Sequence, residues 1–208
     1  MTHTMTLHWS PRSPYVRKVM IVAHEVGLAP RLRIVRTVTG GTEPHLALMK
    51  INPLGKIPTL ELADGTVLYD SPVICEYLDT LHNGARLFPN GPERFVALRR
   101  LALGDGMLDT ALAWVGELRR PAALHSAPHI ALWEAKLLAC AAALEREADA
   151  LEATAFGIGH IALGVALGYL DFRLAGLAWR DGHPRLAAWQ AGFDARPSVR
   201  ANAPVDDL

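Results

Sequence analysis

The sequence predicts a two-part chain, a mixed α/β domain followed by an all-helical domain. Residue composition changes once, near position 80. Residues 1–80 contain 4 alanines and a total of 22 valines, isoleucines and threonines. Residues 81–208 contain 28 alanines and a total of 10 valines, isoleucines and threonines. Because β-branched residues favour strands and alanine favours helices, only the first part should contain a sheet. Residues 81–92 hold two glycines and two prolines, so we expect domains at 1–81 and 92–208 with a linker at 82–91.

The spacing of apolar residues defines each element of the first part. Apolar residues at helical spacing after Pro14 predict a helix that ends at Gly27, since glycine is favoured just past a helix. β-branched runs predict strands, and Ala63-Asp64-Gly65 predicts a hairpin turn. In chain order we expect a strand at Met5–Trp9, a helix from Pro14 to about Val26, a strand at Leu32–Val38, a short helix near Pro44–Met49, hairpin arms at Ile57–Leu62 and Thr66–Tyr69, and a helix from Pro72 to about Leu81.

The second part shows amphipathic patterns of helical period, and the simplest interpretation of its apolar stripes is core packing. One segment, from Ile158 to about Leu174, is apolar on nearly all sides and should be the buried centre of a bundle. The other expected helices begin near Pro92, run from about Ile130 to Leu151, and run from Pro184 to about Ala195.

Charge and cysteine content exclude several classes of protein. The chain has 21 basic and 21 acidic residues, so it lacks the basic surplus typical of nucleic-acid binders and of proteins that adhere to anionic membranes. Cys75 and Cys140 are too few for a disulfide framework, and no Cys/His cluster has metal-binding spacing. The longest apolar run is about thirteen residues, shorter than the ~20 that span a membrane. We expect a cytoplasmic protein with no signal peptide, metal, nucleic acid or membrane partner.

Two Ser-Pro pairs carry the first chemical indication. Ser13-Pro14 and Ser71-Pro72 each follow a predicted strand and begin a predicted helix. Serine is a preferred N-cap residue and proline a preferred first helical residue, so a purely structural cap explains either pair alone. Two helix N-termini at one edge of a sheet would, however, form adjacent anion-binding positions.

Three motifs together resemble the glutathione S-transferase superfamily. They are Ser10–Val19 (SPRSPYVRKV), Asn52–Leu60 (NPLGKIPTL) and Leu68–Ile74 (LYDSPVI), in the family's order and spacing. The helical part is similar to the family at Asp105-Gly106-Met107 and at residues 161–173. The sequence is most similar to bacterial serine-type members, which are theta- or beta-like. The resemblance implies a thioredoxin-like N-terminal domain that binds glutathione, followed by an all-α bundle.

The resemblance also implies roles for individual residues. Ser13 would be the catalytic residue, donating a hydrogen bond to the glutathione thiolate. A cis Ile57-Pro58 bond would let the Ile57 backbone pair with the cysteinyl unit of glutathione. N-capping remains the alternative for Ser13 and for Asp70-Ser71, and a solvated surface charge for Lys56 and Asp105. The implied glutathione-binding residues are Lys56, Ile57, Pro58, Asp70, Ser71 and Asp105, with Asp105 reaching across a homodimer.

The second substrate would be a small, hydrophobic or halogenated electrophile bound between the domains. Core packing is the alternative for the apolar members of its predicted lining, and a solvated side chain for the arginines. We expect glutathione conjugation in detoxification. A low-activity glutathione-binding or protein-interaction module and a glutathione-dependent isomerase or dehalogenase are the alternatives. The predicted lining residues are Arg12, Tyr15, Met107, Ala111, Trp114 and Arg119.

Two positions depart from the usual family pattern. Family members with cysteine at the place of Ser13 perform thiol–disulfide exchange, so that reaction is not expected here. The helix predicted at Ile158 usually begins with a capping box of Ser or Thr and Asp, but Gly157 and His160 stand at those positions. We therefore expect aspartate at position 160 to raise stability by ~0.5–1 kcal/mol.

Overall fold

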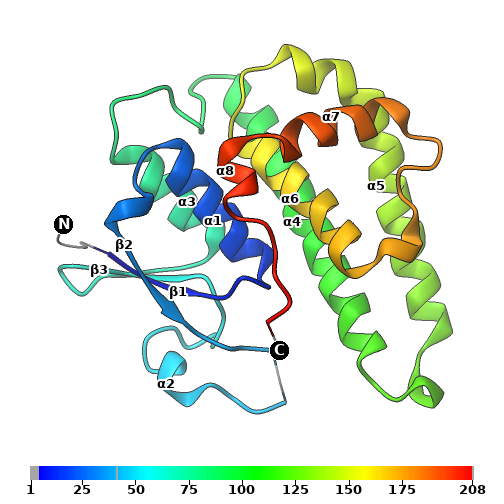
Figure 1. Cartoon of the computed structure of the whole chain (residues 1–208), viewed down its shortest axis with the longest axis horizontal. Helices are drawn as coiled ribbons and strands as arrows, with labels where there is room; N and C mark the ends of the chain where they lie inside the picture. The colour runs from blue at the N-terminus through cyan, green and yellow to red at the C-terminus, as the bar shows by residue number, and fades with distance from the viewer. Residues whose placement is uncertain (1–4, 41, 208) are drawn as a thin grey trace. The chain divides into compact units, whose positions relative to one another are not determined.

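The computed structural model describes residues 5–40 and 42–207 and divides the chain into two compact units (Figure 1). The first unit comprises residues 1–88 and 197–208, and the second comprises residues 89–196. The predicted fold class, a thioredoxin-like domain followed by a helical domain, is confirmed. One segment lies elsewhere than expected, because residues 197–208 belong to the first unit and not to the helical one.

The first unit is built on a four-stranded mixed sheet with strand order β2-β1-β3-β4. β1 (Met5–Trp9) is parallel to β2 (Leu32–Arg36) and antiparallel to β3 (Thr59–Leu62), which pairs antiparallel with β4 (Val67–Leu68). Leu7 and Leu60 are register partners and are fully buried, whereas the alternate residues point to the other face. α1 (Pro14–Glu25) and α3 (Ser71–Thr80) pack against each other beside this sheet.

Local residue chemistry explains where the elements of this unit begin and end. α1 starts after the N-cap Ser13 and ends at Glu25 with Val26 as its C-cap, and Gly27 then adopts φ +72°, as expected for a glycine just past a helix. β3 begins at Thr59, two residues later than expected, since Pro58 has no N–H to donate to a ladder. The short helices η1 (Ala29–Arg31) and α2 (Leu46–Met49) complete the unit together with α8 (Pro197–Arg200) near the end of the chain.

The second unit is helical and is organised around one buried helix. α6 (Ile158–Arg173) is buried along almost all of its length, as its apolar sequence predicts. It packs against α4 (Glu93–Leu118), and the contact is close because a Cβ at Gly104 would lie 2.7 Å from the Ala162 backbone. The remaining elements are η2 (Ala122–Leu124), α5 (Ala127–Ala153), η3 (Ala175–Leu177) and α7 (Pro184–Asp194).

The start of α6 corrects the expectation that its capping box is lost. The Gly157 N–H donates to His160 Nδ1 at 3.1 Å, and Nε2 is 3.0 Å from the Leu151 carbonyl. Nδ1 therefore accepts and Nε2 carries the proton, so a neutral histidine performs the task of the usual carboxylate. Aspartate at position 160 could not donate to Leu151, so a gain in stability is no longer expected.

In the described part of the chain, α5 is the one helix long and apolar enough to cross a membrane by length and composition. Only 17% of its most apolar 18-residue window is buried within the structure. A single helix of this kind is weak evidence for a membrane span, since helices of soluble proteins pass the same criterion.

Candidate active site

The strand register brings three of the predicted motifs to one edge of the sheet. His8 is the partner of Thr59, and Leu60 is the partner of Leu68. When the β1–β3 register is extended by one residue, Trp9 at the end of β1 lies opposite Pro58. When the β3–β4 register is extended by two residues, Pro58 lies opposite Asp70. Because β1 and β4 both run antiparallel to β3, they are parallel to each other, and α1 and α3 both begin at this edge. The N-terminal ends of two helices therefore lie at the same side of the first unit.

Ser13 occupies the N-cap of α1 and is half-buried. Its backbone is extended, and its hydroxyl oxygen accepts from the Val16 N–H at 3.3 Å. Its own N–H donates to the Ser10 carbonyl at 3.2 Å in the preceding turn. Since the hydroxyl oxygen is used as an acceptor, its proton can still be donated to an anion at the helix N-terminus.

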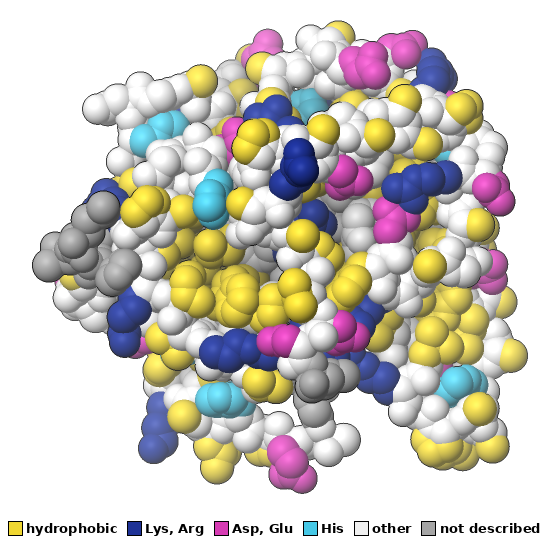
Figure 2. Space-filling model, viewed as in Figure 1, with side chains coloured by type: hydrophobic (Ala, Val, Ile, Leu, Met, Phe, Trp, Pro, Cys, Tyr) yellow, Lys and Arg dark blue, Asp and Glu magenta, His cyan; other side chains and the backbone are white. Residues whose placement is uncertain are grey.

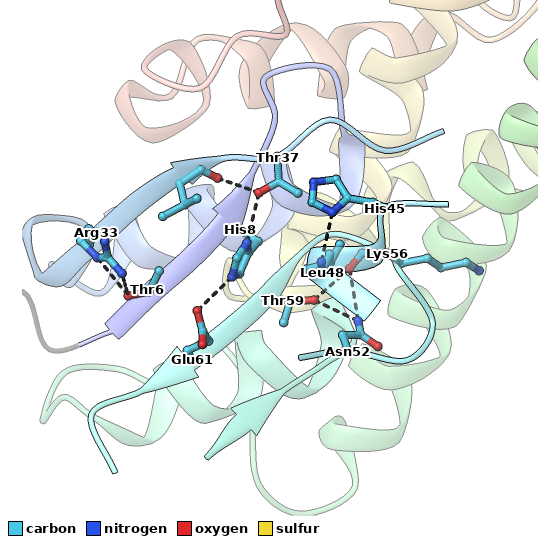
Figure 3. Close-up of polar contacts among 11 residues, drawn as sticks. Thr6, His8, Arg33, Thr37, His45, Leu48, Asn52, Lys56, Thr59 and Glu61 are labelled. Carbon is cyan, nitrogen blue, oxygen red and sulfur yellow. Dashed lines mark hydrogen bonds and ion pairs between the residues drawn. The ribbon is translucent and has the colours of Figure 1, made fainter. Parts of the chain in front are cut away.

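The Ile57-Pro58 peptide bond is cis, as the resemblance implies. The loop before it is held by Asn52, which is buried and whose amide donates to the Lys56 carbonyl at 3.2 Å and to the Thr59 hydroxyl at 2.9 Å (Figure 3). The Thr59 hydroxyl in turn donates to the Lys56 carbonyl at 2.8 Å. Lys56 itself is exposed, and its side chain points away from Asn52 and Thr59 in Figure 3. Asn52 therefore shapes this loop, while the ammonium of Lys56 is accessible to a ligand.

Asp70 and Ser71 form the start of α3. Asp70 is the N-cap residue, is exposed, and makes no side-chain capping bond, and the Tyr69-Asp70 peptide bond is cis. Ser71 is 1% exposed and is the first residue of the helix. α3 was expected to start at Pro72, one residue later. The absence of a side-chain cap at this helix end leaves a favourable position for an anionic group.

The predicted second-substrate residues of the first unit are Arg12 and Tyr15, which are both half-buried. Arg12 is not the solvated arginine of the alternative interpretation, because its Nε lies 3.0 Å from Asp206 of the C-terminal segment. The same segment reaches this turn through its backbone, where the Val205 N–H donates to the Pro11 carbonyl at 3.4 Å. The predicted site thus includes a chain segment that no motif indicated.

The remaining predicted residues lie on α4 in the second unit, except Arg119, which is the C-cap of that helix. Met107, Ala111 and Trp114 are buried, Asp105 is half-buried and Arg119 is exposed. The indole Nε1 of Trp114 is buried and has no hydrogen-bond partner among the described residues. These positions share one helix, so the α4 face that carries Met107, Ala111 and Trp114 is continuous.

The structure also contains a polar cluster that the sequence analysis missed. His8, on the sheet face opposite Leu7, lies between Thr37 at 3.1 Å and Glu61 at 2.9 Å (Figure 3). Alternation along β1 could have placed His8 on this face, but its partners come from two other segments. Among residues 5–40 and 42–207, no group of three or more His, Cys, Asp or Glu side chains could hold a metal ion.

Comparisons with known proteins identify the family. Residues 12–81 match the glutathione S-transferase N-terminal domain, and residues 127–190 match the C-terminal domain. An uncharacterized GST-like protein of Escherichia coli, YibF, is 30% identical over 96% of this chain and 98% of its own length. The chain belongs to the glutathione S-transferase family.

Solved structures of this family support the same conclusion. A Pseudomonas fluorescens glutathione transferase family member with bound glutathione is 42% identical, with a TM-score of 0.94, over 98% of this chain and all of that one. A structure of a family member from the same organism, with bound S-(propanoic acid)-glutathione, is 41% identical, with a TM-score of 0.90 and coverage of 98% and 100%. The similarity therefore extends over nearly the whole of this transferase-family chain.

Proposed function

We propose that the chain binds glutathione at the sheet edge formed by Ser13, Pro58 and Ser71, and conjugates its sulfur to a small electrophile. The observation that carries this proposal is the strand register, which brings the starts of α1 and α3 and the cis Ile57-Pro58 bond to one edge. Family membership and the glutathione bound by the Pseudomonas relative support it.

Ser13 would act as the catalytic residue by stabilising a nucleophile that belongs to the substrate. A thiol like that of cysteine has a pKa of about 8.5, so little thiolate exists at neutral pH. A hydroxyl proton donated to the sulfur and the positive end of α1 both favour the thiolate and lower the thiol pKa. In the reaction the lone pair of the thiolate forms a bond to carbon. In a substitution the bond from that carbon to the leaving group breaks and its electron pair departs with the leaving group; in an addition the π pair of the electrophile takes up a proton instead.

The rest of glutathione would be held by charge and by backbone. The γ-glutamyl carboxylate would accept from Ser71 at the uncapped start of α3, with Asp70 beside its ammonium group. The Ile57 backbone would pair with the cysteinyl unit as an added strand. Lys56 is exposed and could reach the glycyl carboxylate. Asp105 would complete the amino-group site from a partner subunit in a homodimer.

The electrophile is proposed to include carboxylate-bearing compounds. The structure of the Pseudomonas relative with bound S-(propanoic acid)-glutathione, a glutathione derivative that carries a further carboxylate on its sulfur substituent, supports this proposal. The proposed contacts of this second substrate are Arg12, Tyr15, the α4 residues Met107, Ala111 and Trp114, and Arg119 at the C-cap of α4. We also propose a serine-type class, a cytoplasmic detoxification role and no metal.

Ultraviolet difference titration of bound glutathione tests the proposal. Wild type should show a thiolate signal with a depressed pKa, and Ser13→Ala should lose it while still binding glutathione. Ser126→Ala is the matched control, since Ser126 is an N-cap residue of α5 that makes no side-chain capping bond. Binding without thiolate in wild type would support the interaction module, and glutathione that turns over unconsumed or oxidised would support the isomerase or dehalogenase. Absence of glutathione binding would contradict all three.

A further inference from the structure

The C-terminal segment of the chain, residues 201–207, returns to the first unit and ends beside the Ser13 turn. In Figure 1 it descends from α8 along α1 toward the end of β2. Its contacts fall on residues next to Ser13 in the sequence: Pro11 accepts from the Val205 N–H, Arg12 pairs with Asp206, and Arg17 Nε donates to the Asn202 carbonyl at 2.9 Å. We call residues 203–207 the tail.

The segment before the tail is fixed, whereas the tail is held mainly by charge. Ser198 and Val199 of α8 are buried, the Ser198 hydroxyl donates to Glu25, and the Asn202 amide donates to the Ser198 carbonyl at 2.7 Å. By contrast, Val205 is 54% exposed, so apolar burial contributes little beyond Asn202. Ion pairs near the surface are weak, so the tail can detach while α8 stays in place.

Two aspartates of the tail pair with two arginines at the same edge of the sheet. Arg12 Nε is 3.0 Å from Asp206, and Arg36 Nη2 is 2.5 Å from Asp207. Arg36 is the register partner of Trp9 at the end of β1, and Arg12 lies three residues after Trp9 in the sequence. Figure 2 shows basic and acidic side chains side by side near the end of the tail. Each of the two guanidinium groups is already paired with a carboxylate, which is the type of ligand that arginine binds best.

We propose that Arg12 and Arg36 form a carboxylate-binding position beside Ser13, that Asp206 and Asp207 occupy it in the free protein, and that a carboxylate-bearing electrophile displaces them. This inference rests on the proposed function for the identity of the ligand as an electrophile. The aspartates of the tail and the free carboxylate compete for the same guanidinium groups. The apparent affinity for the free carboxylate is therefore the intrinsic affinity multiplied by the fraction of molecules in which the tail has left the site. The tail thereby lowers affinity for anionic substrates and leaves affinity for neutral ones unchanged.

Calorimetric titration with an unreactive pair of probes tests the proposal without requiring glutathione or turnover. The probes are 3-nitrobenzoate and 3-nitrobenzamide, which differ mainly in charge. The double variant Asp206→Asn, Asp207→Asn should bind 3-nitrobenzoate about 3- to 10-fold more tightly than wild type, with no change for the amide. Asp149→Asn is the control, since Asp149 is an exposed acid paired with Arg185 in the other unit. Adding Arg12→Gln to the double variant should abolish the gain.

Several outcomes would overturn the inference. Equal tightening for both probes would make the tail a steric cover and not a carboxylate mimic. No change for either probe, absence of binding in the double variant, or a gain that survives Arg12→Gln would each exclude the arginine site. Because the probes are unreactive, these results are independent of the thiolate titration, which alone decides the proposed function.

Discussion

The sheet edge of the first unit and the α4–α6 pair of the second unit use polar groups in opposite ways. At the edge, Ser13 keeps a hydroxyl proton that can be donated, and the N-cap residue Asp70 makes no side-chain capping bond to α3. In the helical pair, both ring nitrogens of His160 are hydrogen-bonded inside the unit, and Gly104 allows α6 to approach closely. The comparison teaches that the ring of His160 is used by the fold itself, whereas the hydroxyl proton of Ser13 is available to the proposed ligand. Substitutions in the two regions should therefore affect different measurements.

The largest effect is expected at Ser13, on turnover. Ser13→Ala should lower kcat/KM by about 100-fold or more, comparable to removal of one hydrogen-bond donor from an anionic site. Ser13→Gly should lose as much activity but less stability, because glycine costs a helix start only a few tenths of a kcal/mol while alanine costs about 1. Ser13→Thr keeps the hydroxyl and should retain most activity. Steady-state kinetics beside urea unfolding separate the two properties. Equal turnover in the glycine variant and wild type would show that Ser13 is not a catalytic residue.

The opposite result is expected in the helical pair. Gly104→Ala would set a Cβ 2.7 Å from the backbone of Ala162, so it should lower the free energy of unfolding by about 2–3 kcal/mol. Gly106 lies on the same helix, but a Cβ added there would meet no neighbouring element within 4 Å. Gly106→Ala should therefore raise the free energy of unfolding by about 0.5–1 kcal/mol. Urea titration measures both. At temperatures where the variants are folded, kcat/KM should stay within about twofold of wild type in each. Destabilisation by both alanines alike would argue against the close approach.

A smaller effect on ligand affinity is expected at the start of α3. Ser71→Ala should weaken glutathione binding by about 10-fold, since it removes one hydroxyl donor to a carboxylate. Thr80→Ala removes a hydroxyl from the other end of the same helix, where Thr80 donates to the Tyr77 carbonyl. This control should leave the Kd unchanged in calorimetry. If Ser71→Ala binds as wild type does, Ser71 is only a structural residue.

The smallest effect is a pH dependence of stability at His160. Burial lowers the pKa of its imidazole, the nearby Arg100 and Arg196 add to this, and the Leu151 carbonyl opposes it. The folded state therefore favours the neutral ring, so the contribution to stability is complete above the unfolded pKa of about 6.5 and is lost as the pH falls toward the lowered folded value.

His160→Gln provides the test, because glutamine can accept from Gly157 but does not titrate. Below pH 6.5 the wild type should lose at most about 1.4 kcal/mol per pH unit relative to this variant, measured by urea unfolding from pH 7.5 to 5. Parallel stability profiles for the two proteins over that range would contradict this account of the ring.

Much of the fold could be predicted because the deciding interactions are local. Apolar spacing, the Ser-Pro pairs and Gly27 predicted the ends of helices and strands to within a few residues, as for the strand Met5–Trp9 and for the start of α1 at Pro14. The cis Ile57-Pro58 bond could be inferred only through the family resemblance. His8 gave no comparable indication, since its partners Thr37 and Glu61 stand 29 and 53 residues away.

The sequence by itself determined the two-part architecture, because residue propensity and spacing act over short distances. The resemblance of its three motifs to a known family, and not propensity, pointed to the candidate residues Ser13, Pro58, Asp70 and Ser71. Only the tertiary structure decided that His160 completes a helix start, and that the tail pairs Asp206 with Arg12. Both depend on which segments meet in space. Ring orientation and ion pairing follow from packing between distant residues, and no local pattern of residues encodes that packing.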